Sequence, residues 1–277
     1  MNNFMRGRCV AFTHRGMQRP NNEDCLLVAG WIRSSPMEEP IDFELSLSSS
    51  TLVAVADGLG GHAAGEIASE YALARIETLL GGRNEIDEQA VRQSLTQVHR
   101  ELVDLSKAAP AYHGMGTTVA GLLLNRDTVT IFHVGDSRIY RREERFLQLL
   151  TEDDRTTERG YGESAGQGTG NTLLQCLGAQ TEFSNILPHV QIMPRCTKPE
   201  TYLLCTDGLF DLVSLDEMEA SMSDQYDIRV KSLFDKACAG GGRDNVTIVI
   251  LEIAPQTNSY ADESVAIGSG NEQSDPN

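Results

Sequence analysis

Four aspartates stand beside glycine or asparagine at widely separated points of the chain. They are Asp57 (before Gly58), Asp136 (in the run Gly135-Asp136-Ser137-Arg138), Asp207 (before Gly208) and Asp244 (before Asn245). Three of these aspartates border an apolar run that is typical of a buried strand. A carboxylate at the end of such a strand loses solvation unless a positive group meets it. Several strand ends gathered at one sheet edge would form an all-oxygen pocket, which suits hard divalent cations.

The residues around these aspartates indicate how such a pocket would be built. The predicted strand Thr51–Ala56 delivers Asp57 to its end, where Gly58 lets the backbone turn and leaves its carbonyl accessible as a ligand. A glycine-rich turn with an exposed acid is the structural alternative for Asp57, and a capped type I turn is the alternative for Asp136. The same design recurs at two further predicted strands, Thr201–Cys205 before Asp207 and Val246–Ile253 after Asp244.

An arginine and two more carboxylates lie close together near the N-terminus. Glu23 and Asp24 are adjacent at the start of the predicted strand Cys25–Trp31, and Arg19 lies four residues before Glu23. Arginine is the side chain best suited to grip a phosphate with two parallel hydrogen bonds. A surface ion pair is the alternative for Arg19. Together with the acidic pocket, this segment points to chemistry on a phosphate group.

The rest of the chain predicts the elements that must hold these residues. Two amphipathic helices, Ala63–Leu80 and Ile86–Lys107, follow one another and are expected to form an antiparallel pair. Ser214 and Glu217 form a capping box that opens a short helix. Further helices are expected at 171–177 and 225–239, a mobile surface loop at 153–170, and a loop or irregular hairpin at 32–50. The other predicted strands are Arg8–Thr13, Thr117–Leu124, Thr128–Val134, Arg138–Arg141 and Phe146–Leu149.

The order of these elements predicts the fold class. Strands come first, then two helices, many strands, more helices and a last strand, without the long βαβ alternation of a parallel sheet. We therefore expect an α+β fold in which two mostly antiparallel sheets carry helices on their outer faces. Residues 1–254 are expected to form one catalytic domain. Residues 255–277 are polar and acidic, contain no Lys or Arg, and are expected to form a disordered tail.

Composition and charge narrow the classes of function. The 277-residue chain carries a net charge of −17, which argues against nonspecific binding to nucleic acid or to an anionic membrane. No run approaches the ~20 apolar residues of a membrane span, and no apolar signal region follows the polar N-terminus. The six cysteines form no CxxC pair and most lie in apolar runs, which predicts reduced, buried thiols in a cytoplasmic protein.

Seven motifs occur in an order and at spacings that resemble one family. They are R-x-x-x-E-D, D-G-x-G-G-H, G-T-T, G-D-S-R, N-x-x-x-x-x-L-G, D-G-L-x-D and G-x-x-D-N, running from Arg19 to Asn245. A single D-G pair carries no weight, but the ordered set is highly specific. The chain resembles the bacterial form of the metal-dependent type-2C Ser/Thr protein phosphatases, over about residues 8–253.

The resemblance implies a fold, cofactors and a role for each candidate residue. The fold would be a four-layer α-β-β-α sandwich, and the cofactors would be two Mn²⁺ or Mg²⁺ ions with a weaker third. Asp57 would bridge the two ions, and the Gly58 carbonyl would bind one of them. Asp207 and Asp244 would bind the other ion, and Asp136 would bind the third ion together with Asp207. Glu23 would act through metal-bound water, and Asp24 would be a ligand or a supporting catalytic group. Arg19 would bind the substrate phosphate.

The resemblance also implies the reaction and the partners. Direct attack of a metal-bridging hydroxide would hydrolyse phosphoserine or phosphothreonine in proteins, without a covalent intermediate. His62 is the candidate general acid, although it lies five residues after Asp57, so a structural histidine at the helix start stays open. His133 is expected in the core or on the sheet surface. The expected partners are phosphorylated proteins and a cognate Ser/Thr kinase, and the expected state is a monomer.

One stretch departs from the family pattern. Where relatives carry T-x-D-H-S, this chain has Thr151-Glu152-Asp153-Asp154-Arg155, followed by the glycine-rich segment 160–170. We expect altered substrate selection, so that Asp154→His changes substrate preference or KM more than metal affinity. Three other functions are alternatives: a phosphatase-like regulatory domain without catalysis, a hydrolase of nucleotides or nucleic acid, and a binding module with an acidic tail. The intact ligand positions argue against a regulatory domain without catalysis. The charge of −17 argues against nucleic acid as a substrate. A pure binding module would not account for the strand-end aspartates.

Overall fold

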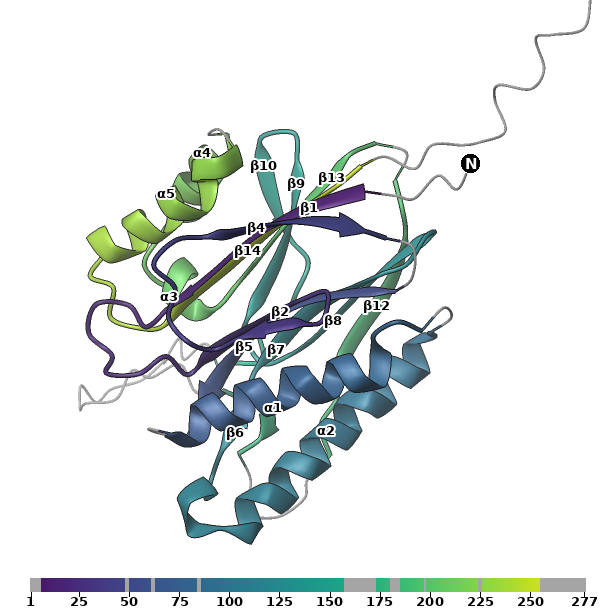
Figure 1. Ribbon diagram of the computed structural model, residues 1–277, viewed down its shortest axis with the longest axis vertical. Coiled ribbons are helices and arrows are strands. Elements are labelled where there is room, and N and C mark those ends of the chain that lie inside the picture. The colour runs from purple at the N-terminus through teal and green to yellow at the C-terminus, as the bar shows by residue number, and fades with distance from the viewer. Residues whose placement is uncertain are drawn as a thin grey trace, which may run out of the picture.

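Two antiparallel β-sheets face each other at the centre of the molecule and helices cover both outer faces, as Figure 1 shows for the computed structural model. The structure describes residues 6–47, 50–60, 63–83, 86–156, 173–179, 185–196, 198–223 and 226–254. The predicted α+β sandwich with four layers is therefore confirmed.

The first sheet combines strands from both ends of the chain. Its central strand β14 (Val246–Ile253) pairs antiparallel with β1 (Arg6–His14) and with β13 (Glu200–Cys205). The sheet continues from β1 to β4 (Ile41–Ser46), and from β13 to β9 (Arg138–Glu143) and β10 (Phe146–Leu149). Chain segments more than 200 residues apart therefore lie side by side.

The second sheet is built around β5 (Thr51–Leu59), which pairs with strands on both sides. Its strand order is β11 (Leu177–Gly178), β6 (Gly116–Thr117), β5, β7 (Val119–Leu124), β8 (Thr128–Val134) and β12 (His189–Pro194). The strand β2 (Asp24–Val28) pairs with β5 and with β3 (Trp31–Arg33). The strands are rich in buried Val, Leu, Ile and Ala because both faces of each sheet are covered.

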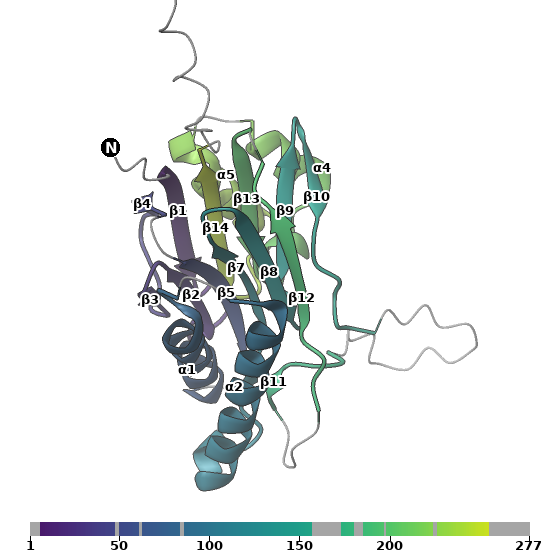
Figure 2. The same cartoon turned by 90° about the vertical axis from the view of Figure 1, so that its right-hand side faces the viewer.

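The helices divide between the two outer faces. The helices α1 (Ala63–Leu80) and α2 (Glu88–Ala108) lie together on the second sheet, whereas α4 (Leu215–Ser221) and α5 (Tyr226–Ala239) cover the first (Figures 1 and 2). Asp87 caps α2, and the predicted Ser214 capping box opens α4. Two short helices complete the set, η1 (Pro110–Tyr112) and α3 (Asp207–Phe210).

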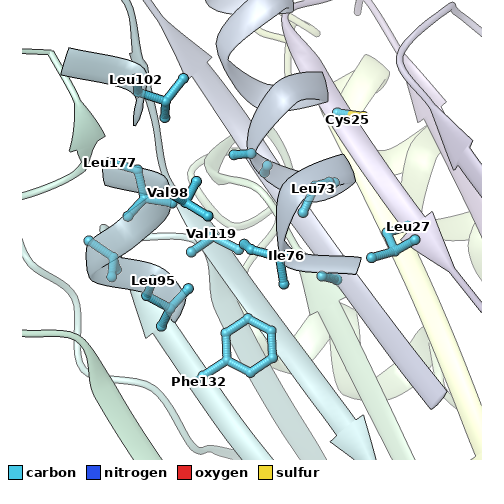
Figure 3. Packing of buried hydrophobic residues seen from close by; sticks show 14 of the residues in the cluster. Cys25, Leu27, Leu73, Ile76, Leu95, Val98, Leu102, Val119, Phe132 and Leu177 are labelled. Atoms are coloured by element: carbon cyan, nitrogen blue, oxygen red, sulfur yellow. The ribbon is translucent and has the colours of Figure 1, made fainter. Parts of the chain in front are cut away.

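Three layers of buried apolar side chains hold the four structural layers together. One lies between the sheets, one between the first sheet and α3–α5, and one between the second sheet and the α1–α2 pair. In the last of these, Leu73 and Ile76 of α1 meet Leu95 of α2 above Phe132 of β8 (Figure 3). Because the sheets are fixed on both faces, the residues at their edges are positioned by rigid strands.

The structure corrects the sequence-based picture at two places. The helix expected at 171–177 is wrong within the described residues, because Leu173 bridges Arg155 and Leu177 pairs with Thr117 of β6. A short apolar run does not distinguish one helical turn from an edge strand. The strand β12 was missed altogether. The segment 32–50, expected as a loop or hairpin, contains β4, which covers the edge of β1.

Several expectations fall on residues outside the described ranges. They are His62, segment 157–172 and the tail 255–277, so the predicted domain boundary at residue 254 stays a prediction. Four of the six cysteines are buried free thiols, whereas Cys196 is exposed and Cys238 is half-buried. Among the helices of the described ranges, none combines the length and the apolar character needed to cross a membrane.

Candidate metal centre

Both sheets deliver acidic residues to one edge of the sandwich. Asp57 lies near the end of β5, Asp24 is directly opposite it on β2, and Asp207 follows the end of β13. A cleft of about 530 Å³ opens there, and we call it the acidic cleft. Its lining includes Arg19, Glu23, Asp57, Gly58, Asp207, Asp244 and Asn245. Six of the nine residues singled out from the sequence as site residues thus line one cleft.

The backbone of Asp57 is clamped from both sides by the G-T-T motif. Its N–H donates to Thr118 Oγ1 (3.0 Å), and its carbonyl accepts from Thr118 N and Thr117 Oγ1 (both 2.9 Å). Burial, together with the charges of Asp24 and Asp207, raises the pKa of Asp57 well above its ordinary value. The motif therefore holds a carboxylate in a position where its own charge is disfavoured.

Gly58 is required by close backbone approach. A Cβ at this position would lie 2.2 Å from the Gly65 carbonyl oxygen and 2.5 Å from that of Glu23. The Gly58 N–H donates to the Glu23 carbonyl (3.1 Å), and Ser69 Oγ donates to the same oxygen (2.7 Å). This packing joins β5, the start of α1 and the N-terminal segment that carries Glu23.

Asp24 is fully buried and lies beneath the acidic cleft. Its Oδ2 accepts hydrogen bonds from Thr206 Oγ1 and Thr247 Oγ1, both at 2.8 Å. Its Oδ1 is buried and has no hydrogen-bond partner among the described residues. Burial raises the pKa of Asp24 to about 8, against the two hydroxyl hydrogen bonds, which lower it. Neither threonine was predicted as a site residue, although Thr206 directly precedes Asp207 and Thr247 lies two residues after Asn245.

Asp207, at the start of α3, is also a buried carboxylate with a raised pKa and an oxygen that has no hydrogen-bond partner among the described residues. Burial, followed by the charges of Asp244 and Asp136, raises its pKa to about 7, and its Oδ1 also lacks a hydrogen-bond partner in the described part of the chain. Buried carboxylate oxygens without partners are costly unless a cation meets them. An all-oxygen set of this kind fits hard divalent ions such as Mg²⁺ and Mn²⁺.

Arg19 and Asp244 form an ion pair at the rim. Arg19 Nη2 donates to Asp244 Oδ2 at 2.8 Å, and both side chains remain partly exposed. Asn245 holds the N-terminal segment that carries Arg19 in place. Its Oδ1 accepts a hydrogen bond from Glu23 N (2.8 Å), and its Nδ2 donates to the Asn21 carbonyl (2.8 Å). The D-N motif does not by itself predict this role of Asn245, which joins the N-terminal and C-terminal parts of the site.

Asp136 lies beside an arginine of this chain and does not line the acidic cleft. Arg155 Nη1 is 3.7 Å from Asp136 Oδ2 and 3.6 Å from Asp211 Oδ1, and Arg155 Nε donates to Asp153 Oδ2 at 3.0 Å. Burial raises the pKa of Asp136, and the guanidinium opposes that rise. Asp153 also receives two hydrogen bonds from Arg138 (2.9 and 2.7 Å). The start of the predicted 153–170 loop is therefore anchored.

Comparison with known proteins places the chain in a family. The family model described as protein phosphatase 2C matches residues 42–238. The chain is 32% identical over 255 residues to the serine/threonine phosphatase stp of Listeria monocytogenes, covering 87% of this chain and 93% of that protein. It is 29% identical over 263 residues to the serine/threonine protein phosphatase PstP of Mycobacterium tuberculosis, covering 89% of this chain and 45% of PstP.

Solved structures agree with the sequence comparison. The crystal structure of Mycobacterium tuberculosis PstP superposes with a TM-score of 0.66 at 28% identity, covering 90% of this chain and 99% of that one. A bacterial serine phosphatase at 24% identity shares the fold with a TM-score of 0.71. The chain belongs to the protein phosphatase 2C family, and the resemblance inferred from its motifs is confirmed. Members of this family depend on metal ions.

Proposed function

We propose that this chain is a metal-dependent phosphoric monoester hydrolase that removes phosphate from phosphoserine and phosphothreonine in proteins. The observation that supports the proposal most strongly is the convergence of Asp57, Asp207 and Asp244 with Arg19 on one cleft. The named relatives are serine/threonine phosphatases. The substrate class therefore rests on the family, and the site chemistry rests on the acidic cleft.

We propose that the acidic cleft holds two Mn²⁺ or Mg²⁺ ions. Asp57 and the Gly58 carbonyl would hold one ion, with Asp57 shared, and Asp207 and Asp244 would hold the other. Such ions supply an activated water at neutral pH and offset the negative charge of the phosphoryl group. Glu23, at the rim of the same cleft, would position water, and Asp24 would orient its neighbours from below through its free Oδ1.

Arg19 is proposed to bind the substrate phosphate. Its side chain is about half exposed at the cleft rim, and its single hydrogen bond to Asp244 leaves other guanidinium N–H groups for a phosphate. A substrate phosphate bound by Arg19 at the rim would be oriented toward the acidic residues of the cleft. The general acid stays a proposal for His62, which the described residues do not include. The kinase partner, the monomeric state and the cytoplasmic location also stay proposals from the sequence.

Hydrolysis of a phosphothreonine peptide tests this function. The purified protein would be assayed with Mn²⁺, with Mg²⁺ and with EDTA, beside Asp207→Asn and the control Asp235→Asn, an exposed acid on α5 far from the cleft. We expect activity only with metal, and a loss of about 100-fold or more in Asp207→Asn alone. A folded wild-type protein that binds Mn²⁺ but releases no phosphate would refute the proposal.

A further inference from the structure

A second group of metal-binding side chains lies away from the acidic cleft. His133 on β8 is directly opposite His189 on β12, and their rings stack with centroids 4.3 Å apart. Asp154, in the segment after β10, brings Oδ1 to 3.0 Å from His189 Nε2. One donor atom from each of the three residues lies within 4.8 Å of the other two. We call His133, Asp154 and His189 the histidine cluster.

His133 has a donor atom that the protein leaves unused. The residue is only 4% exposed; its Nε2 accepts a hydrogen bond from Glu152 N (3.4 Å), whereas its Nδ1 is buried without a hydrogen-bond partner among the described residues. Burial, followed by the charge of His189, lowers the pKa of His133 to about 4. The imidazole is therefore neutral at physiological pH, which is the form that binds metal ions.

Solvent reaches the cluster through its own cleft. The cleft has a volume of about 410 Å³ and is lined by His133 and His189, with Glu152 and Arg92 nearby. His189 is partly exposed, with 36% of its side chain accessible. An ion could therefore enter, and water or the Glu152 carboxylate could complete its coordination.

We propose that His133, Asp154 and His189 bind a transition-metal ion of the Zn²⁺ class, at a site separate from the acidic cleft. Two imidazoles and one carboxylate suit Zn²⁺, Co²⁺ or Ni²⁺, whereas Mg²⁺ prefers oxygen alone. Tetrahedral coordination at Zn–N distances near 2.1 Å requires donors about 3.4 Å apart. The widest donor separation must therefore shorten by up to about 1.4 Å, which rotation of the partly exposed His189 side chain can supply.

Asp154 connects this site to the turn that carries Asp136. Its Oδ2 accepts from Gly135 N (2.9 Å), and its own N–H donates to the Gly135 carbonyl (3.1 Å). The same carboxylate accepts from Gln175 Nε2 (2.8 Å). In family members with histidine in place of Asp154, this carboxylate would be missing. The departure noted in the sequence thus creates the third ligand of the proposed site.

Zinc titration in the presence of saturating Mg²⁺ tests the proposal. Mg²⁺ competes for the oxygen-only sites, and Zn²⁺ that displaces it there does so in the wild type and in the cluster variants alike, so the ion bound by the histidine cluster is counted as the difference between them. The variants are His189→Ala and Asp154→Asn, which keeps an oxygen for Gly135 N. The matched control is His113→Ala, which removes an exposed histidine outside the cluster. Thermal unfolding checks that each variant is folded.

We expect one additional Zn²⁺ ion in the wild type and in His113→Ala, bound at least about tenfold more weakly in the two cluster variants. Imidazole nitrogen resonances of His133 and His189 should shift when Zn²⁺ is added, which locates the ion independently of affinity. The proposal is overturned if the wild type takes up no additional ion, or if both cluster variants bind Zn²⁺ as tightly as the control. Phosphatase activity enters none of these readouts, so the outcome is independent of the proposed function.

Discussion

The acidic cleft and the histidine cluster both gather polar side chains at sheet edges, but they differ in how their charges are balanced. In the acidic cleft, Asp24, Asp57 and Asp207 are buried beside one another, and each has a raised pKa. In the histidine cluster, one carboxylate meets two imidazoles and is satisfied by backbone and side-chain donors. The first region is electrostatically strained without a cation, whereas the second pairs its one carboxylate with donors from the chain itself.

This difference indicates that the acidic cleft lowers the stability of the metal-free protein, because the function requires buried carboxylates. Like charges in a buried site cost free energy, and natural proteins tolerate that cost mainly where activity requires it. The histidine cluster gathers no like charges, so at neutral pH removing one of its ligands should affect metal uptake more than stability. The following predictions test the contrast from its largest expected effect to its smallest.

The largest effect is expected from Asp57→Asn. The change removes the proposed bridging carboxylate, so the phosphatase rate should fall by about 100-fold or more. It also removes a carboxyl whose ionised form is disfavoured in the metal-free protein by burial and by the charges of Asp24 and Asp207. The metal-free variant should therefore melt higher than the metal-free wild type, by about 2–4 °C for each kcal/mol relieved.

Activity assays with Mn²⁺ and thermal unfolding in EDTA measure the two effects of Asp57→Asn. Asp235→Asn serves as the control, because Asp235 is exposed on α5 and takes no part in the cleft. A variant that loses activity and also stability would indicate that Asp57 is mainly a structural residue.

The next effect concerns pH in the absence of metal. The pKa values of Asp24 and Asp207 are raised to about 8 and about 7, so between about pH 4 and pH 8 the folded protein holds more protons than the unfolded chain. Stability in EDTA should therefore fall as pH rises through this window. With Mn²⁺ the trend should reverse, because the ion binds the deprotonated carboxylates and stabilises the folded state.

Melting temperatures at several pH values, with EDTA and with Mn²⁺, test this expectation. Asp57→Asn should flatten the curve in EDTA, since it removes one buried carboxyl whose own raised pKa contributes to the slope. A wild-type protein whose stability in EDTA rises steadily from pH 5 to pH 8 would contradict the proposed strain.

The histidine cluster should respond to pH with the opposite sign. The pKa of His133 is lowered to about 4, so between about pH 4 and pH 6.5 the unfolded chain holds more protons than the folded protein. This contribution is present above the unfolded pKa and is lost as pH falls. Relative to His133→Asn, the wild type should lose roughly 2 kcal/mol of stability between pH 7 and pH 5. Denaturant titrations of both proteins at the two pH values, in EDTA, measure the difference, and equal losses would contradict it.

The acidic cleft could be predicted from the sequence to a much greater extent than the histidine cluster. Asp57, Asp207 and Asp244 each adjoin a strongly apolar strand, so their places at strand ends follow from local patterns. His133 and His189 come together only through the pairing of β8 with β12, and β12 has no clear strand pattern. Long-range pairing of two ordinary segments leaves no local signal that a sequence alone could provide.

The contact of Arg155 with Asp136 is a second long-range arrangement that no local sequence pattern predicts. The family resemblance implies Asp136 as a ligand of a weak third ion, and no local sequence pattern indicates that Arg155 lies beside it. In the structure its side chain is only 10% exposed, and its guanidinium lies among Asp136, Asp153 and Asp211. A permanent cation of the chain therefore already offsets part of the charge that a third ion would meet.

The smallest expected effect tests this interpretation with Arg155→Ala. Removing the guanidinium leaves Asp136 without a positive neighbour, and an added divalent ion becomes the means of offsetting its charge. Calorimetry with Mn²⁺ should count two ions in the wild type and one additional, weak ion in Arg155→Ala. Arg155→Lys keeps the positive charge and should retain the wild-type count. A third weak ion already bound to the wild type would contradict this interpretation, because it would show that the ion and the Arg155 guanidinium can lie beside Asp136 together.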